Sequence, residues 1–276
     1  MKTVTLRDGE QMPMLGQGTW MMGERPDRRT DEIAALRTGV DLGMTLIDTA
    51  EMYGDGAAEC LIAEALGDRR DELFLVSKAF PHNASRDRLG RACEASLQRL
   101  GTDRIDLYLL HWRGPVPFAE TVEAMEKLRA EGKIRHWGVS NLDEDDMDEL
   151  LEAGGSACAT NQILYNLTRR GPEHDLLPWL ATRHIPAMAY SPVEQGRLLQ
   201  DEDLSAIARR LGATAAEVAL AWTMRSGQVI AIPKAGTPAH VRDNRRAADL
   251  VLSGDDLAAL DRAFPQPRAP VPLEML

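Results

Sequence analysis

Three apolar segments of this chain each end in side chains that can take part in acid–base chemistry. Asp48 and Tyr53 follow the first segment, Lys78 ends the second, and His111 ends the third. A buried lysine is costly unless a carboxylate pairs with it, and Asp48 can supply that charge. Because a nearby cation stabilises a phenolate, Lys78 is expected to lower the pKa of Tyr53 from ~10 toward neutrality. The group then suits protonation of a carbonyl oxygen by Tyr53, with His111 orienting that oxygen.

Each of these residues alone also has a purely structural interpretation. Asp48 could cap a turn or form a buried salt bridge with Lys78, Tyr53 could be an aromatic at the rim, and His111 could belong to the core. The four together favour a catalytic site. Hydrolysis is not indicated, because no nucleophile or activated water is evident. An aldolase with Lys78 as a Schiff-base nucleophile is the weakest interpretation, because Asp48 would keep the lysine charged.

Composition excludes several classes of protein. A formal net charge of −11 argues against nucleic acid as a partner, because phosphate contacts require a basic surface. No window of ~18 apolar residues predicts a membrane helix, and the first residues lack the apolar core of a signal peptide. The chain has three cysteines, an odd number, and they lack the spacing of metal ligands: Cys60, Cys93 and Cys158. We therefore expect a cytoplasmic monomer with free, buried thiols and no bound metal.

Apolar segments alternate with helical patterns along most of the chain. Counting from Leu15 to Val229 gives eight strands, most of them the continuous apolar runs that are typical of buried parallel strands. Eight such units in about this length predict a single (β/α)8 TIM barrel domain over residues 1–276. The strands are expected near residues 14–20, 45–47, 73–77, 105–110, 134–139, 157–160, 186–189 and 229–232.

The N-terminal segment and the helix starts also carry local signals. Alternating residues around Asp8-Gly9 predict a β-hairpin over residues 3–13, covering the bottom of the barrel. A doubly wound sheet is the alternative fold, but it needs a Gly-rich phosphate loop after the first strand. The segment Gly16-Gln17-Gly18 fails that pattern, since Met21 stands where Gly or Ala is required. Helix N-caps are predicted at Asp143, Thr214, Thr237 and Ser253.

In a TIM barrel, the carboxyl ends of the strands line one mouth, and the active site lies there. Nearly every predicted strand delivers a polar or aromatic side chain to that mouth. So many such groups at one face are difficult to explain as helix caps. They are Trp20, Asp48, Lys78, His111, Ser140, Asn141, Gln162, Tyr190, Ser191 and Lys234.

Six motifs spread over essentially the whole chain resemble those of the aldo-keto reductase family. Within that family, the chain is most similar to bacterial reductases that act on methylglyoxal and other small aldehydes. The motifs are Leu46-Ile47-Asp48-Thr49-Ala50-Glu51-Met52-Tyr53-Gly54, Val76-Ser77-Lys78, Leu107-Tyr108-Leu109-Leu110-His111-Trp112, Ile134-Arg135-His136-Trp137-Gly138-Val139-Ser140-Asn141, Ala189-Tyr190-Ser191-Pro192 and Ile232-Pro233-Lys234.

The resemblance implies NADPH as cofactor, bound extended across the mouth, and a catalytic tetrad of Asp48, Tyr53, Lys78 and His111. It implies that amide and hydroxyl groups bind the carboxamide, that an aromatic ring stacks on the nicotinamide, and that polar groups bind the phosphates and adenine. The implied residues are Ser140, Asn141 and Gln162 for the carboxamide and Tyr190 for the nicotinamide ring. For the phosphates they are Ser191, Pro192, Lys234, Thr237 and His240, and for the adenine Asp243 and Asn244. Gly18, Thr19, Trp20 and Asp48 complete the implied cofactor-binding set.

Two departures from the family pattern concern the adenosine 2′-phosphate. Ala235 replaces a common serine, and His240 replaces an arginine that often grips this phosphate. Both changes remove phosphate contacts, so NADH is an alternative cofactor unless Arg242 or Arg245 compensates.

The substrate pocket is expected to be narrow, because Trp20, Phe80 and Trp112 wall it and the Pro-rich segment 265–276 crosses the mouth. The resemblance implies NAD(P)H-dependent reduction of small aldehydes and ketones to alcohols. The alternative is a regulatory or sensing module on the same fold that binds NADPH and turns over little.

Overall fold

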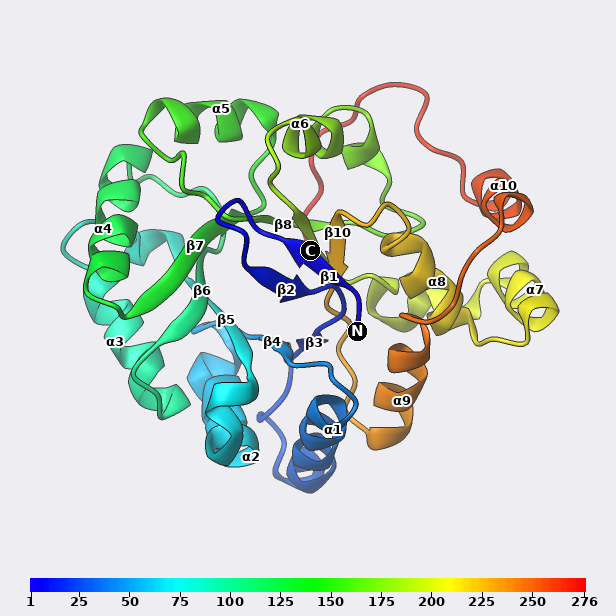
Figure 1. Ribbon diagram of the computed structural model, residues 1–276, viewed down its shortest axis with the longest axis horizontal. Coiled ribbons are helices and arrows are strands. Elements are labelled where there is room, and N and C mark those ends of the chain that lie inside the picture. Colours follow the sequence, from blue (N-terminus) through cyan, green and yellow to red (C-terminus); the bar gives the residue numbers. More distant parts are fainter.

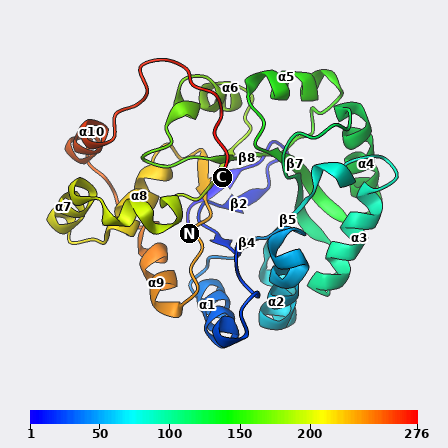
Figure 2. The ribbon, with the colours of Figure 1, turned by 180° about the vertical axis from the view of Figure 1, so that it is seen from behind.

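The computed structural model describes residues 1–276 as a barrel of parallel strands surrounded by helices (Figure 1, Figure 2). Strands β3 to β10 follow one another round the sheet in chain order, each parallel to its neighbours. Parallel bridges from Leu15 to Ala231 and from Gly18 to Lys234 join the first strand to the last. The predicted (β/α)8 barrel is therefore confirmed.

The regular elements of the barrel have the following bounds. The strands are β3 Gln17–Gly18, β4 Leu46–Asp48, β5 Phe74–Ala79, β6 Ile105–Leu110, β7 Ile134–Ser140, β8 Asn161–Leu164, β9 Ala187–Tyr190 and β10 Val229–Ala231. The helices are α1 Arg29–Asp41, α2 Ala57–Leu66, α3 Leu89–Leu100, α4 Phe118–Ala130, α5 Glu144–Glu152, α6 Leu176–Thr182, α7 Glu202–Leu211, α8 Ala215–Thr223, α9 Pro238–Arg246 and α10 Gly254–Ala263.

The first strand is much shorter than the predicted segment 14–20. At Gly18 a Cβ atom would lie 2.8 Å from the carbonyl oxygen of Ile232, so only glycine allows the two ends of the sheet to approach here. Beyond this point the chain leaves the sheet, and the Trp20 side chain is exposed at the mouth.

The strand predicted near residues 157–160 is displaced, because the observed strand starts directly after that segment, at residue 161. The last two residues of the segment already reach β7, since the Ala159 N–H donates to the Trp137 carbonyl at 2.9 Å and the Thr160 carbonyl accepts from Val139 at 3.0 Å. The strand β8 begins at Asn161, which pairs with Ala187 of β9.

Polar residues can occupy this buried strand because the side-chain NH2 of each has an acceptor. The Asn161 amide donates to the carbonyl of Leu142 at 2.7 Å, and the Gln162 amide donates to Asp48 at 2.8 Å.

The expectation that all three cysteines are buried is also wrong. Cys93 and Cys158 are buried, but Cys60 is exposed. The buried face of α2 repeats at helical spacing through Ala58, Leu61 and Ala65, and Cys60 lies out of phase with it.

The barrel interior is apolar below and polar at the mouth. Alternate residues of each strand point inward. Leu46 and Val76 belong to the buried apolar cluster inside the barrel, and the next inward positions toward the carboxyl end are Asp48 and Lys78. The sheet thus places these polar side chains directly above a dry core.

Helix starts agree with the predicted caps. The side chains of Asp143, Thr214, Thr237 and Ser253 each accept a hydrogen bond from the backbone N–H three residues later. Because α8 and α9 both begin at the mouth, the caps at Thr214 and Thr237 fix two helix N-termini beside the cavity described below.

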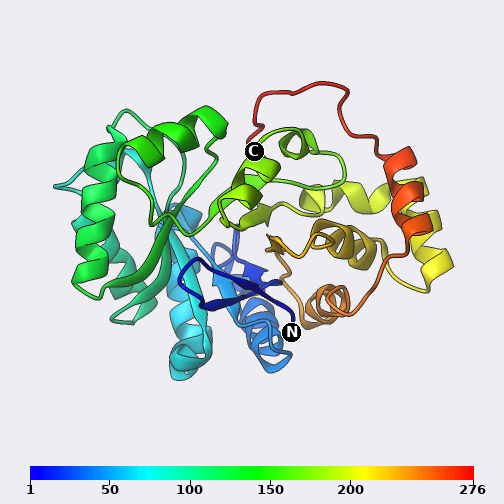
Figure 3. The same cartoon turned by 45° about the horizontal axis from the view of Figure 1, so that its top comes forward.

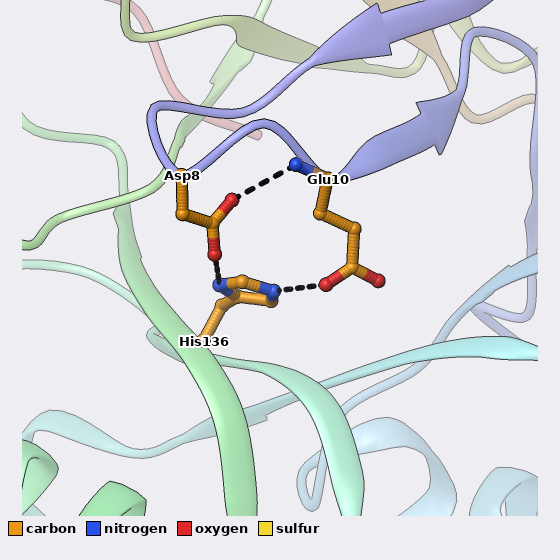
Figure 4. A group of neighbouring side chains, drawn as sticks. All are labelled: Asp8, Glu10 and His136. Carbon is orange, nitrogen blue, oxygen red and sulfur yellow. Dashed lines mark hydrogen bonds and ion pairs between the residues drawn. The ribbon is translucent and has the colours of Figure 1, made fainter.

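The predicted hairpin is formed by β1 (Thr3–Thr5) and β2 (Gln11–Pro13) and lies across the amino ends of the strands. Val4 and Met12 are buried and close the bottom of the core. The hairpin turn is fixed to β7 through His136, whose ring nitrogens lie 3.5 Å from Asp8 and 2.7 Å from Glu10 (Figure 4). Glu10 also pairs with Arg135 at 2.6 Å.

The last segment, residues 265–276, forms neither helix nor strand. It runs from α10 back to the centre of the molecule (Figure 3), on the side opposite the hairpin. None of the helices combines the length and the apolarity that crossing a membrane would require.

Candidate active site

A buried ammonium group organises the mouth of the barrel. Lys78 Nζ donates to Asp48 Oδ2 at 2.8 Å, to the Thr49 carbonyl at 2.7 Å and to the Tyr53 hydroxyl at 3.1 Å. The side chain of Lys78 is 0% exposed. All three N–H donors are therefore used, and the lysine orients the Tyr53 hydroxyl at a fixed position.

Tight turns follow Tyr53, where the chain passes into α2. Gly54 and Gly56 have φ values of 57° and 90°, in the left-handed region that glycine adopts without a steric penalty. Asp55 between them also has a positive φ, 51°. The backbone N–H of Glu51 donates to the Lys78 carbonyl at 3.3 Å, which ties the turn to β5.

The predicted direction of the Tyr53 pKa is wrong in this structure. Burial raises the pKa of the phenol above its usual value, and the charge of Lys78 offsets that effect only in part. For Lys78, burial alone would lower the pKa, but Asp48 and Tyr53 raise it above its usual value. Tyr53 thus holds its proton at neutral pH, and the adjacent cation favours the phenolate once the proton has been transferred.

His111 is a neutral imidazole. Burial, assisted by the charge of Lys78, lowers its pKa to about 2. Its ring lies 5.9 Å from the Tyr53 ring at 72°, and its Nδ1 has no hydrogen-bond partner within the protein. A neutral ring can donate one hydrogen bond to a carbonyl oxygen without adding a second positive charge.

This assignment predicts a pH-dependent stability. Between pH 6.5 and about 2, the unfolded chain binds a proton at His111 that the folded protein does not bind. Stability is therefore unaffected above the unfolded pKa and falls as the pH drops below it, by up to ~1.4 kcal/mol per pH unit. Urea unfolding from pH 7 to pH 5 should show a steeper loss for the wild type than for His111→Gln. Equal slopes would contradict the neutral assignment.

A cavity of ≈ 960 Å³ opens above the tetrad. Its walls bring together residues from every part of the chain, as the strand ends predicted. The predicted residues that line it are Gly18, Trp20, Asp48, Tyr53, His111, Trp112, Ser140, Asn141, Gln162, Tyr190, Ser191, Pro192, Lys234, His240, Asp243 and Asn244.

Four predicted residues do not line the cavity. Thr19 is buried and donates its hydroxyl to the Asp48 carbonyl at 2.9 Å, and Lys78 lies beneath Tyr53. Thr237 caps α9. Phe80, expected as a wall, packs edge-on against Trp112, with ring centroids 6.0 Å apart. Its contribution to the pocket is therefore to support Trp112.

A hydrogen-bonded chain of polar groups lies beside the tetrad. The Tyr190 hydroxyl donates to Asn141 Oδ1 at 2.9 Å, and Asn141 Nδ2 donates to Ser140 Oγ at 3.0 Å. Ser140 Oγ in turn donates to the Gln162 carbonyl at 2.9 Å. Asn141 has a φ of 59°, a conformation that non-glycine residues seldom adopt outside constrained sites.

Several cavity residues were not predicted. They belong to five segments: the loops after β3, β4 and β9, the start of α8 and the end of the chain. Two signals pointed to them. The capping box of Thr214 placed a helix N-terminus there, and the Pro-rich segment 265–276 was expected to cross the mouth, where Met275 and Leu276 lie. Besides Thr214, these residues include Met21, Met52, Val193, Gln195, Gly196, Leu199, Ala215, Ala216, Met275 and Leu276.

The family sequence model described as Aldo/keto reductase family matches residues 14–264. The chain belongs to the aldo-keto reductase family.

Two curated relatives and two crystal structures of this family are similar to the chain over nearly its whole length. Methylglyoxal reductase YeaE of Escherichia coli is 52% identical over 100% of this chain and 99% of that protein. Glyoxal reductase of Bacillus subtilis is 33% identical over 99% and 97%. Structures of a Klebsiella pneumoniae aldo-keto reductase, with NADP and acetate and with NADPH, have a TM-score of 0.97 and 52% identity over 100% and 99%.

As an aldo-keto reductase, this chain is an oxidoreductase, and the predicted family is confirmed. The Schiff-base alternative gains no support, because every proton of the Lys78 ammonium is donated to a fixed acceptor. Among the residues considered for the 2′-phosphate, Arg245 turns away. Its guanidinium donates to the Leu42 carbonyl at 3.1 Å and to Asp249 at 2.7 Å. Arg242 is exposed and does not line the cavity.

Proposed function

We propose that this aldo-keto reductase reduces methylglyoxal and similar small aldehydes and ketones to alcohols, with NADPH as the hydride donor and Tyr53 as the proton donor. The observation that carries the proposal is the Tyr53 hydroxyl, held at 3.1 Å by buried Lys78 at the floor of the cavity and beside neutral His111. The names of the two curated relatives support the substrate class, and the two Klebsiella structures support the cofactor.

The donor groups of the cavity fit a phosphorylated dinucleotide. A volume of ≈ 960 Å³ is at the upper end of ordinary ligand pockets. Amide and hydroxyl groups from β7 and β8 lie near the tetrad, while Lys234 and His240 supply basic groups from the segment after β10. Bound NADPH supplies a hydride to the carbonyl carbon.

Each side chain near the tetrad can be assigned to one part of the cofactor. Because Gln162 Nε2 is committed to Asp48, its carbonyl oxygen remains to accept from a carboxamide. Asn141 and Ser140 complete this contact, and the Tyr190 ring is fixed through its hydroxyl to stack on the nicotinamide. The phosphates are assigned to Ser191, Pro192 and Lys234 with the first turn of α9, and the adenine to Asp243 and Asn244. Gly18 and Trp20 line the same cavity.

Proton transfer follows from the tetrad. His111 and the Tyr53 hydroxyl both hydrogen-bond the substrate oxygen, so the carbonyl carbon faces the hydride. As charge develops on that oxygen, Tyr53 gives up its proton. The phenolate is stabilised by Lys78, whose own charge is balanced by Asp48.

The choice between NADPH and NADH tests the assignment of His240. A guanidinium binds phosphate through two parallel hydrogen bonds, which an imidazole cannot make. His240→Arg should therefore lower KM for NADPH by about tenfold and leave KM for NADH unchanged. Arg242→His is the matched control, because Arg242 lies on the same helix outside the cavity. An unchanged NADPH-to-NADH ratio in His240→Arg would place the 2′-phosphate elsewhere.

The proposed activity is tested by oxidation of NADPH and NADH in parallel over a panel from methylglyoxal to aromatic aldehydes. We expect turnover with NADPH and the small aldehydes. Tight NADPH binding without turnover of any panel member would instead favour the regulatory or sensing module.

We also propose that residues 1–276 act as one catalytic domain, as a cytoplasmic monomer that binds neither nucleic acid nor membranes. The free state of all three cysteines supports a reducing compartment, and the acidic charge supports the lack of a nucleic-acid partner. Sedimentation analysis gives the oligomeric state directly.

A further inference from the structure

The C-terminal tail, residues 265–276, takes part in the cavity although it has no regular structure. Its last two residues, Met275 and Leu276, line the cavity and are 58% and 57% exposed. An irregular segment with so much exposed surface needs anchors elsewhere to hold it at the mouth. Figure 3 shows the long course over which these anchors must act.

Most of the anchors come from one short segment, the β8 loop, residues 165–174, and the backbone of Leu276 also hydrogen-bonds Tyr190. Arg170 Nη1 donates at 2.6 Å to the carbonyl of Phe264, the residue before the tail, and the His174 ring lies 2.5 Å from the Pro267 carbonyl. At Gly171 a Cβ atom would lie 2.6 Å from a Val271 methyl group, so the tail packs directly on the loop. Arg169 Nη1 donates to Glu274 at 2.5 Å. The β8 loop therefore sets the path of the tail.

The same loop holds a second cavity segment, the β9 loop, residues 191–200. Glu194 is buried with a φ of 50°, and its carboxylate accepts from Arg169 Nη2 at 2.8 Å and from Asn166 Nδ2 at 2.7 Å. Asn166 Nδ2 also donates to the Ser191 carbonyl at 2.9 Å. Because Ser191 and Gln195 line the cavity, these contacts fix the wall assigned to the cofactor phosphates.

A network of ion pairs makes the β8 loop a rigid support. Glu173 accepts from the Tyr165 hydroxyl at 2.7 Å, from Arg170 Nη2 at 2.8 Å and from Arg225 Nη2 at 2.9 Å. The side chains of Arg170 and Glu173 are 7% and 12% exposed. Charges paired in a largely buried network are held more firmly than pairs on the surface.

We infer that Arg169 is a positioning residue that couples the β9 loop, which forms the cofactor wall, to the C-terminal tail at the mouth of the cavity. Its guanidinium joins Glu194 of the β9 loop to Glu274 of the tail, so each segment is held in place by the other through one side chain. Coupling of this kind is reciprocal: a tail released from Arg169 weakens cofactor binding, and a bound cofactor orders the tail. The inference rests on the proposed function, since it assigns the β9 loop to NADPH.

The test measures NADPH affinity by fluorescence titration, and kcat and KM for methylglyoxal and for a bulky aromatic aldehyde. Glu274→Gln removes one half-exposed ion pair outside the cavity and should weaken NADPH binding by about two- to fivefold. It should also change KM for the aromatic aldehyde, while kcat for methylglyoxal stays unchanged. Arg169→Gln should show a larger loss of NADPH affinity, because the buried Glu194 carboxylate then keeps only the exposed Arg197 as a charged partner, at 3.1 Å. Arg169→Lys should restore part of the affinity.

Asp71→Asn is the matched control, because Asp71 forms a single exposed pair with Arg104 at 2.8 Å and does not line the cavity. In Arg169→Gln, the change Glu274→Gln should have no further effect on NADPH affinity. Wild-type NADPH affinity in Glu274→Gln, or fully additive effects in the double variant, would overturn the inference. Failure of the proposed function would be distinct, because the wild-type protein itself would then bind no NADPH or reduce no aldehyde.

Discussion

Tyr53→Phe is expected to lose about 10²- to 10⁴-fold in kcat and to keep its affinity for NADPH. The substitution removes the one hydroxyl that both receives a hydrogen bond from Lys78 and lies at the floor of the cavity. His111 cannot replace it as a proton donor, because burial and the charge of Lys78 lower the pKa of the ring and keep it neutral at neutral pH. Steady-state reduction of methylglyoxal and NADPH titration measure the two quantities.

Tyr108→Phe is the matched control for this substitution. Tyr108 is buried in β6 outside the cavity, and its hydroxyl has no hydrogen-bond partner, so the same atom is removed without touching the site. Its turnover should equal that of the wild type. Near wild-type turnover in Tyr53→Phe would show that another group delivers the proton.

Lys78→Met should be inactive to a similar degree and should also be less stable. Removal of the ammonium leaves the Asp48 carboxylate buried, with Gln162 but no charge partner, which typically costs ~3–5 kcal/mol. The free energy of unfolding from urea titration and kcat for methylglyoxal should therefore fall together.

The double variant Asp48→Asn, Lys78→Met separates the two effects. It contains no unpaired buried charge, so most of the lost stability should return, while turnover should remain low because no cation stabilises the Tyr53 phenolate. A stable double variant with restored turnover would mean that Lys78 acts only in folding.

Most of the barrel could be predicted from the sequence because apolar strands and amphipathic helices have different periods. Strand boundaries were less certain where a polar residue is satisfied inside the barrel. Asn161 and Gln162 lie within β8 because Leu142 and Asp48 accept from their amides, and a partner 19 or 114 residues away is not visible in a local pattern.

That Asp48, Tyr53, Lys78 and His111 meet at one mouth could also be predicted, because parallel strands bring their carboxyl ends together there. The direction of the Tyr53 pKa shift could not be predicted from the sequence. The types of residue suggested attraction between the phenolate and Lys78, but the opposing effect depends on how deeply the hydroxyl is buried. The contact between Arg169 and the tail could not be predicted either, because the two side chains that form it are 105 residues apart.

Transfer of deuterium tests the central claim most directly. The purified protein is incubated with methylglyoxal and NADPH deuterated at the transferred C4 position, and the alcohol is analysed by mass spectrometry. Direct hydride transfer with protonation by Tyr53 predicts one deuterium on the newly formed carbinol carbon and none on the oxygen after exchange in water. Formation of an alcohol without deuterium on that carbon, or oxidation of the cofactor without any alcohol, would contradict the proposed function.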